Sequence, residues 1–282
     1  MSRMSRKRVT GSAACCAAAL LILPACSSDG DGKDKVKDRT GGVGNLSARE
    51  ISDKAKQELL DAKSVHISMR ATGSDATKDT DSDTESDSDA DTDSDSDDPA
   101  SMELTLDRDG NCVGSMKMAN GAALELVKRG DKVWVKPDEK FWKTQVPGGE
   151  GEAAAEIFKN RYVHGTTSDV MLREVSEVCD LRKVQKEIED DSDDATKSLA
   201  KGEPTTLDGT DVIPLTGKDD GKETTLYVAT EGKPYLLKAV EKGDGDDTTT
   251  TFSDYDKPVP SKTPSADESV DVSKLQRQLQ KI

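Results

Sequence analysis

Short segments of alternating apolar and polar residues between positions 101 and 137 constrain the fold more than any other feature of this 282-residue chain. Alternation with a period of two is typical of strands that bury one face and expose the other. The dipeptides Asp109-Gly110 and Asn120-Gly121 separate these segments, and both are typical of tight β-hairpin turns. The pattern therefore predicts an antiparallel meander of at least four strands, whose alternate apolar positions include Met102, Leu104, Leu106, Met116, Met118, Leu124, Leu126, Val133 and Val135.

The segments around this meander predict a mixture of helices and strands. Ser47-Ala-Arg-Glu50 has the spacing of a capping box, with Leu46 and Ile51 as a hydrophobic staple. A helix is expected over 48–62, a strand over 65–71, and a frayed helix or loop over the polar stretch 183–201. Further helices are expected over 153–162 and 170–178, the latter with Ser168 as N-cap, and further strands over 212–216, 224–228, 235–240 and 248–252. This order is typical of an α+β domain.

The first 26 residues have the layout of a bacterial lipoprotein signal. A basic start is followed by an uncharged, mostly small and apolar run that ends in Leu23-Pro24-Ala25-Cys26. This layout is typical of an export signal, and the run is too short for an ordinary membrane span. The four residues resemble a lipobox, in which the thiolate of Cys26 is alkylated with a diacylglyceryl group. A cleaved signal with a chance cysteine and an uncleaved anchor are the alternatives.

Residues 74–98 are nearly all Asp, Ser and Thr. Twelve acidic residues and one lysine give this tract a net charge of −11. Such a run repels itself and buries nothing, so a disordered inserted loop is expected. A specific calcium site is a weaker interpretation than a diffuse atmosphere of cations, because the glycine and the closing glutamate of a twelve-residue calcium loop are missing.

These features define the expected organisation of the chain. Residues 1–25 form a signal peptide, 26–45 a flexible tether rich in Gly, Asp and Lys, and 46–265 one domain that contains the 74–98 loop; residues 266–282 form a polar tail. Cys112 and Cys179 are the cysteines of the mature domain. Because exported proteins meet an oxidising environment, a disulfide between them is expected, with two separate buried thiols as the alternative.

The sequence offers little evidence for catalysis, and we expect no enzyme. Gly110-Asn-Cys112-Val-Gly114 matches a thiol nucleophile elbow, but that motif needs a strand before it and a helix after it. His66 and His164 are expected at surface or capping positions, and no cofactor or metal site is expected. The formal net charge of −16 argues against a nucleic-acid partner.

Several segments together resemble the actinobacterial LppX/LprAFG-type lipoproteins, relatives of the LolA/LolB carriers. They are 46–62 with Ser64-Val-His-Ile-Ser68, 130–136, 224–237 and 252–259. The resemblance implies a strongly curved, unclosed antiparallel β-sheet with helices on its concave face and an apolar cavity between them that holds acyl chains. The apolar strand positions expected to line that cavity are Ile67, Met69, Leu104, Leu106, Met116, Met118, Leu124 and Leu126. Flexible methionines suit varied chains, although an ordinary methionine-containing core explains them equally well.

Two functions follow as hypotheses. The first is a monomeric lipoprotein on the outer face of the cell membrane, anchored through an acylated Cys26 (diacylglyceryl, palmitate-type chains), that binds or transfers lipid. The second is a non-catalytic structural or interaction protein of the cell envelope, with a filled core and an acidic loop that buffers cations.

Overall fold

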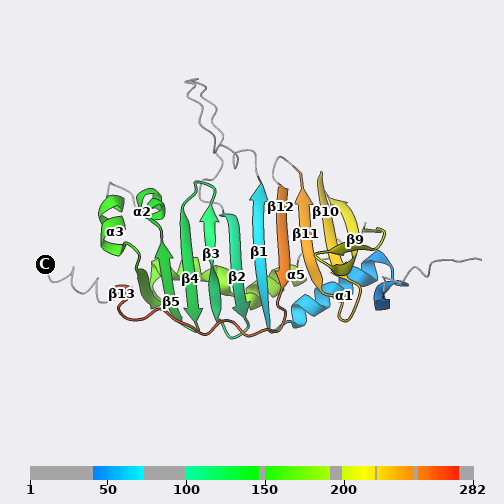
Figure 1. Ribbon diagram of the computed structural model, residues 1–282, viewed down its shortest axis with the longest axis horizontal. Helices are drawn as coiled ribbons and strands as arrows, with labels where there is room; N and C mark the ends of the chain where they lie inside the picture. The colour runs from blue at the N-terminus through cyan, green and yellow to red at the C-terminus, as the bar shows by residue number, and fades with distance from the viewer. Residues whose placement is uncertain are drawn as a thin grey trace, which may run out of the picture. The chain divides into compact units, whose positions relative to one another are not determined.

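The computed structural model describes residues 41–72, 99–145, 150–190, 199–219, 221–243 and 247–272 (Figure 1). These residues belong to the second of the two units into which the chain divides, Asp38–Ile282. The expected signal peptide, Cys26, the acidic tract 74–98 and the last ten positions, 273–282, lie outside the described residues.

One large unclosed sheet dominates the described residues, in the strand order β13-β6-β5-β4-β3-β2-β1-β12-β11-β10-β9-β7, with β8 pairing to β9. The pairs are antiparallel except for β13 with β6. The predicted meander is confirmed as four consecutive neighbours, β2 to β5. The strands are β1 (Ser64–Thr72), β2 (Pro99–Asp107), β3 (Cys112–Met118), β4 (Ala123–Arg129), β5 (Lys132–Pro137), β6 (Tyr162–Thr166), β7 (Ala200–Lys201), β8 (Thr205–Leu207), β9 (Thr210–Asp219), β10 (Lys222–Ala229), β11 (Leu236–Lys242), β12 (Asp247–Ser253) and β13 (Ser269–Asp271).

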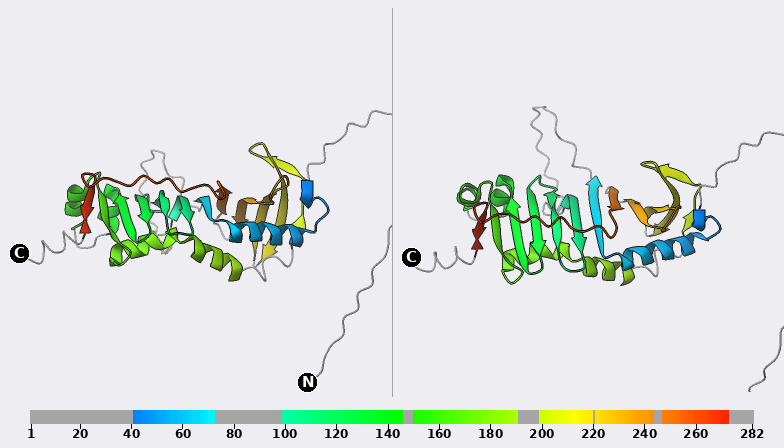
Figure 2. Two further views of the ribbon diagram at one scale, coloured as in Figure 1. Left: turned by 90° about the horizontal axis from the view of Figure 1, so that it is seen from below. Right: turned by 60° about the horizontal axis from the view of Figure 1, so that its bottom comes forward.

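The helices pack mainly on one face of this sheet. They are α1 (Ala48–Asp61), α2 (Glu139–Gln145), α3 (Gly151–Phe158), α4 (Val170–Ser176) and α5 (Leu181–Asp190), with short 3-10 turns η1 (Gly41–Val43) and η2 (Glu177–Cys179). Figure 2 shows α1, α4 and α5 along one side of the sheet, and the segment 254–268 along the other. The chain therefore has the predicted α+β class, with a large, curved, mostly antiparallel sheet.

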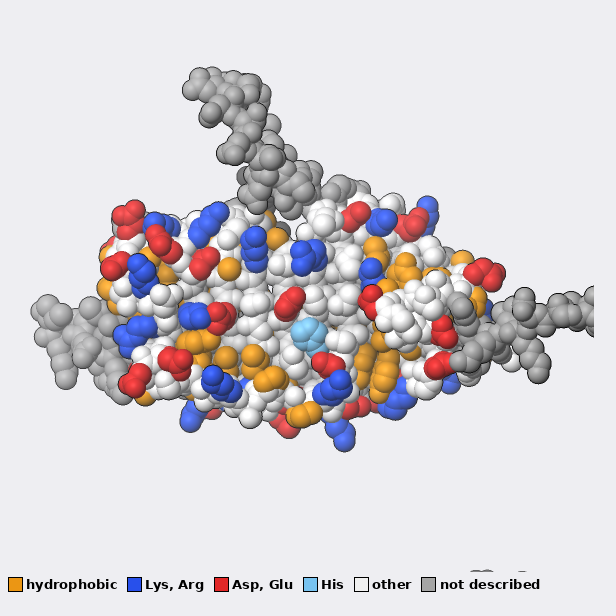
Figure 3. All heavy atoms as spheres, in the orientation of Figure 1, with side chains coloured by type: hydrophobic (Ala, Val, Ile, Leu, Met, Phe, Trp, Pro, Cys, Tyr) orange, Lys and Arg blue, Asp and Glu red, His pale blue; other side chains and the backbone are white. Residues whose placement is uncertain are grey.

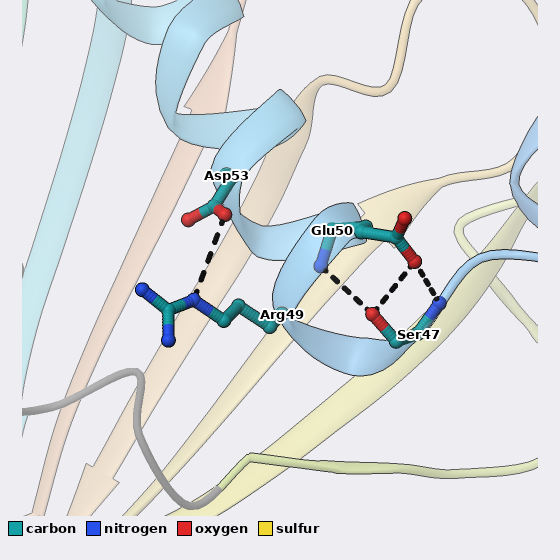
Figure 4. A network of polar contacts seen from close by, with 4 residues as sticks. All are labelled: Ser47, Arg49, Glu50 and Asp53. Atoms are coloured by element: carbon teal, nitrogen blue, oxygen red, sulfur yellow. Dashed lines mark hydrogen bonds and ion pairs between the residues drawn. The ribbon is translucent and has the colours of Figure 1, made fainter.

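Helix α1 begins where the sequence predicts. Ser47 Oγ accepts a hydrogen bond from the Glu50 amide, and the Glu50 carboxylate accepts one from the Ser47 amide at 2.8 Å (Figure 4). These bonds satisfy amides that have no partner within the helix. Ile51 is buried, and Leu46 packs against the same cluster, as a hydrophobic staple requires.

The main core lies between the helices and strands β1 to β6. Its largest fully buried side chains include Leu104, Leu106 and Leu126 from the strands and Leu172 and Leu181 from the helices. Cys112 of β3 and Cys179 of η2 form a disulfide with an S–S distance of 2.07 Å. The bond joins the sheet covalently to the helices that cover it.

The segment 254–268 starts at the core and continues along the opposite face. Tyr255 packs against the main core cluster, stacks on Tyr235 with 4.2 Å between ring centroids, and donates from its hydroxyl to Leu236 O at 2.7 Å. Further along, Arg129 donates to Pro260 O, and Glu268 O accepts from the Tyr162 amide at 2.8 Å. Figure 3 shows acidic and basic side chains scattered over this face, with hydrophobic ones gathered along the edge where the segment runs.

Several local features differ from the sequence interpretation. The helix expected over 153–162 ends at Phe158, because Tyr162 already begins strand β6. Asp169, not Ser168, is the N-cap of α4, and its carboxylate accepts from the Thr166 amide at 2.7 Å. The sequence analysis also missed helix α2 and the strands β6, β7, β8 and β13. The polar stretch after 183, expected as a frayed helix or loop, is helical as part of α5 as far as Asp190.

Candidate functional site

A cavity of about 850 Å³ lies between one end of strands β1 to β5 and helices α2 and α3. Each of these five strands contributes wall residues, as do both helices and the turn after α3. The volume falls within the roughly 300–1,000 Å³ of small-molecule sites.

A continuous apolar row crosses the strands at this end of the sheet. Met69 pairs with Met102, Met102 with Met116, Met116 with Leu124, and Leu124 with Pro137. Directly paired residues point to the same side of a sheet. Met116 and Leu124 belong to the core cluster that contains Leu172 and Leu181 of the helices, so the row lies on the helix-covered face, and all five residues line the cavity.

The eight residues expected to line a cavity divide between this row and the solid core. Met69, Met116 and Leu124 line the cavity. Ile67, Leu104, Leu106 and Leu126 are buried in the core cluster, and Met118 packs against that cluster in a partly buried position. The alternation thus identifies the covered face, but the cavity occupies only one end of it. Met102, Trp142 and Ala155 are wall residues that the sequence analysis did not select for the site.

Helices α2 and α3 form the wall opposite the strands. Trp142 of α2 is buried and stacks on Phe158 of α3, with 5.0 Å between ring centroids and 24° between planes. Gly151 permits this close approach, since a Cβ atom there would lie 2.4 Å from Trp142 O. The other tryptophan, Trp134 of β5, stacks on His164. The alternation along β5 places it on the face away from the core residues Val133 and Val135.

Charged side chains make up much of the remaining lining. Lys136 Nζ lies 2.6 Å from Glu125 Oε1, and Tyr162 donates to Glu125 Oε2 at 2.6 Å. Partial burial alone would raise the pKa of Glu125, but the hydrogen bonds from Lys136 and Tyr162 outweigh it and hold that pKa below its usual value. Lys143 and Glu139 form a second ion pair, also at 2.6 Å. The cavity therefore combines an apolar row with a charged lining.

The residues considered for catalysis lie apart from this cavity. The Nδ1 atom of His66 lies 2.9 Å from Thr105 Oγ1, His164 stacks on Trp134, and Cys112 is bonded to Cys179. Among the described residues, no group of three or more His, Cys, Asp or Glu side chains is arranged to hold a metal ion. Within the same part of the chain, no helix is both long and apolar enough to cross a membrane.

Comparisons with known proteins give matches only among solved structures. No family model and no curated protein matches the chain. The lipoprotein LprF from Mycobacterium bovis is 13% identical over 78% of this chain and 97% of its own, with a TM-score of 0.49. Lipoprotein LppX from Mycobacterium tuberculosis is 13% identical over 76% and 98%, with a TM-score of 0.45. A LolA superfamily protein from Nitrosomonas europaea is 13% identical over 79% and 99%, with a TM-score of 0.25. At 13% identity, all three are distant likenesses.

Proposed function

We propose that this chain is a lipoprotein of the cell envelope, similar to the LppX/LprAFG type, that binds lipid acyl chains between its sheet and its helices α2 and α3. The observation that carries the proposal is the in-register row from Met69 to Pro137 along a cavity of about 850 Å³. A cavity of this size beside a continuous apolar row favours a carrier over the alternative of an interaction protein with a filled core.

The chemistry of the wall suits flexible apolar ligands. Three adjacent strands contribute methionines, at positions 69, 102 and 116, and unbranched thioether side chains adapt to irregular shapes. Apolar burial gives the driving force without a demand for one exact ligand geometry. The charged lining supplies groups that polar lipid head groups require, while the row accepts the chains.

The proposed anchor is the lipidated Cys26 at the end of the signal. Two acyl chains on one cysteine hold a protein on a membrane much more firmly than one chain does. A tether over 26–45 would keep the domain near its donor membrane, on the outer face of the cell membrane. We expect Cys26→Ser to abolish incorporation of labelled palmitate and to release the protein from the membrane fraction. Unchanged labelling of that variant contradicts this part of the proposal.

The ligand is tested on the mature chain carrying Cys26→Ser, purified without detergent from the host that exports it. Native mass spectrometry is expected to show a protein–lipid complex whose lipid is released on denaturation. In the same background, Ala155→Phe places a ring in the cavity wall and should reduce the lipid-bound fraction severalfold. Ala200→Phe makes the same change at an exposed position of β7 and should leave that fraction unchanged.

Absence of bound lipid would contradict the proposal. If the folded mature chain carries no lipid and takes none up from vesicles, the cavity is not an acyl-chain site. The interaction-protein hypothesis then becomes the better one.

A further inference from the structure

The indole nitrogen of Trp142 stands out among the buried polar groups. Only 5% of the residue is exposed. Within the described part of the chain, Trp142 Nε1 is the one buried side-chain nitrogen or oxygen without a hydrogen-bond partner. An indole N–H acts only as a donor, and buried donors in native proteins nearly always have an acceptor. This exception therefore requires an explanation.

The location of Trp142 suggests where the missing acceptor comes from. Its side chain belongs to the cavity wall together with Met116, Leu124 and Ala155, none of which has an oxygen acceptor in its side chain. Acidic residues of α2 and α3 also reach the cavity, but Glu139 pairs with Lys143, and no carboxylate accepts from the indole. Both neighbouring aromatic rings, Phe141 and Phe158, are purely apolar.

We propose that Trp142 Nε1–H donates a hydrogen bond to the carbonyl oxygen of an acyl ester or acid in the cavity. This inference rests on the proposed function and narrows its ligand class to carbonyl-bearing acyl lipids, as opposed to plain hydrocarbon chains. A donor beside the apolar row fixes the position of a chain that apolar contacts alone would leave free to slide. The low local dielectric strengthens such a bond once it forms.

The burial of Nε1 sets a condition on how the acceptor arrives. A ligand reaches the nitrogen only when a neighbouring wall residue moves aside. The methionines of the cavity wall, at positions 69, 102 and 116, have three rotatable side-chain bonds each and change shape at low cost. The aromatic stack with Phe158 keeps the indole ring in place while this happens.

The composition of the chain makes this proposal measurable. It contains two tryptophans. A two-dimensional ¹H–¹⁵N correlation NMR spectrum of the mature chain with Cys26→Ser therefore has two indole N–H signals. The variants Trp134→Phe and Trp142→Phe assign them, because each removes one signal. We expect methyl laurate or laurate, delivered from cyclodextrin, to move the Trp142 indole proton downfield. Dodecane should occupy the cavity without that downfield shift, and the Trp134 signal should stay in place with all three probes.

A second experiment compares the affinities of the variants for the same probes. Trp142→Phe keeps an aromatic ring in the wall but removes the donor. It is expected to weaken binding of methyl laurate about three- to tenfold and to change dodecane binding by less than about twofold. Trp134→Phe, on the other face of the sheet, is the matched control and should alter neither affinity.

The outcomes separate this inference from the proposed function. If the probes bind, but ester, acid and dodecane shift the Trp142 signal alike and Trp142→Phe keeps wild-type affinity, the inference is overturned and the acyl-binding function stands. If no probe binds, both are overturned. A shift with methyl laurate alone identifies an ester ligand, and a shift with laurate alone identifies a free acid. Should Trp142→Phe fail to fold, the shifts in the wild-type spectrum decide the question.

Discussion

At the scale of single residues, Gln185 and Arg108 connect helices α1 and α5 through hydrogen bonds. Gln185 of α5 is buried, and its amide nitrogen donates to Leu59 O and Ala62 O at the end of α1, both at 2.9 Å. Its carbonyl oxygen accepts from Arg108 Nε at 3.1 Å, and the Arg108 guanidinium also donates to Leu60 O. These bonds supply partners for carbonyl groups that every helix leaves free at its C-terminus.

Gln185→Leu should therefore destabilise the protein despite its similar volume. The substitution leaves two helix-end carbonyls buried without donors, and we expect the free energy of unfolding to fall by about 2 kcal/mol. Urea denaturation followed by circular dichroism measures this change. Gln57→Leu, at an exposed position of α1, should stay within about 0.5 kcal/mol of wild type. Equal effects of the two variants contradict the role assigned to Gln185.

The lowered pKa of Glu125 predicts a dependence of stability on pH. Its folded-state pKa lies below the ordinary value of 4.5, so the folded state binds this proton less well than the unfolded state does. The contribution of Glu125 is therefore fully present above the unfolded pKa and is lost as pH falls through the folded pKa. Because the pair with Lys136 is half exposed, about 0.5 kcal/mol is expected. Thermal melts of wild type and Glu125→Gln should differ at neutral pH and converge at acidic pH; a constant difference contradicts the prediction.

At the scale of elements, the cap of α1 is the clearest case of local sequence determining local structure. Ser47→Ala removes one side of the capping box and should lower the free energy of unfolding by about 1 kcal/mol. Ser168→Ala is the matched control, because the structure gives the N-cap position of α4 to Asp169. The free energy of unfolding of Ser168→Ala should stay within about 0.5 kcal/mol of the wild-type value. Chemical denaturation of both variants tests the pair, and a larger loss for Ser168→Ala would show that the sequence-based choice of cap was right.

Elements with strong local signals could be predicted, and those fixed by distant partners could not. The alternating runs predicted β1 to β5, and the short strand segments at 212–216, 224–228, 235–240 and 248–252 predicted β9 to β12. Strand β6 has the sequence Tyr-Val-His-Gly-Thr, which carries little alternation, and its neighbour β13 has only three residues. Their parallel pairing, Val163 with Val270, joins segments far apart in the chain. Helix α2 has the sequence Glu-Lys-Phe-Trp-Lys-Thr-Gln, whose two apolar residues are adjacent and so show no helical spacing.

The candidate site was partly predictable for the same reason. Strand alternation correctly placed Met69, Met116 and Leu124 on the covered face. It gave no information on where along that face the helices leave room. That depends on α2 and α3, which Gly151 and the stack of Trp142 on Phe158 hold together. No local pattern in the strands reports on those contacts.

At the scale of the whole molecule, the disulfide is the main covalent constraint among the described residues. Cys112 and Cys179 are separated by 67 positions in the chain, and closing a loop of this size is expected to contribute about 4 kcal/mol. Cys112→Ala with Cys179→Ala should lower the urea midpoint accordingly. A reducing agent should lower the midpoint of wild type but not that of the double variant. An unchanged wild-type midpoint, with both thiols shown to be free by alkylation, contradicts this prediction.

The edges of the sheet predict a monomer. Strand β7 at one edge has two residues and β13 at the other has three, and short edge strands disfavour pairing between molecules. Sedimentation of the mature chain with Cys26→Ser should show a single species of monomer mass across the micromolar range. A concentration-dependent dimer contradicts the prediction.

The position of β1 has a consequence for how the chain reaches its folded state. β1 pairs with β2 on one side and with β12 on the other, where His66 lies opposite Ser253. During synthesis, β1 is made first among the strands, but its hydrogen bonds on one side are completed only when β12 is made, almost at the end of the sheet. The meander β2 to β5 forms from local contacts and β1 pairs with its edge strand β2, but until β12 is present the open edge of β1 is a template for association with other chains. The interval during which this edge stays open is therefore set by the topology, and it ends only after residue 253 has been made.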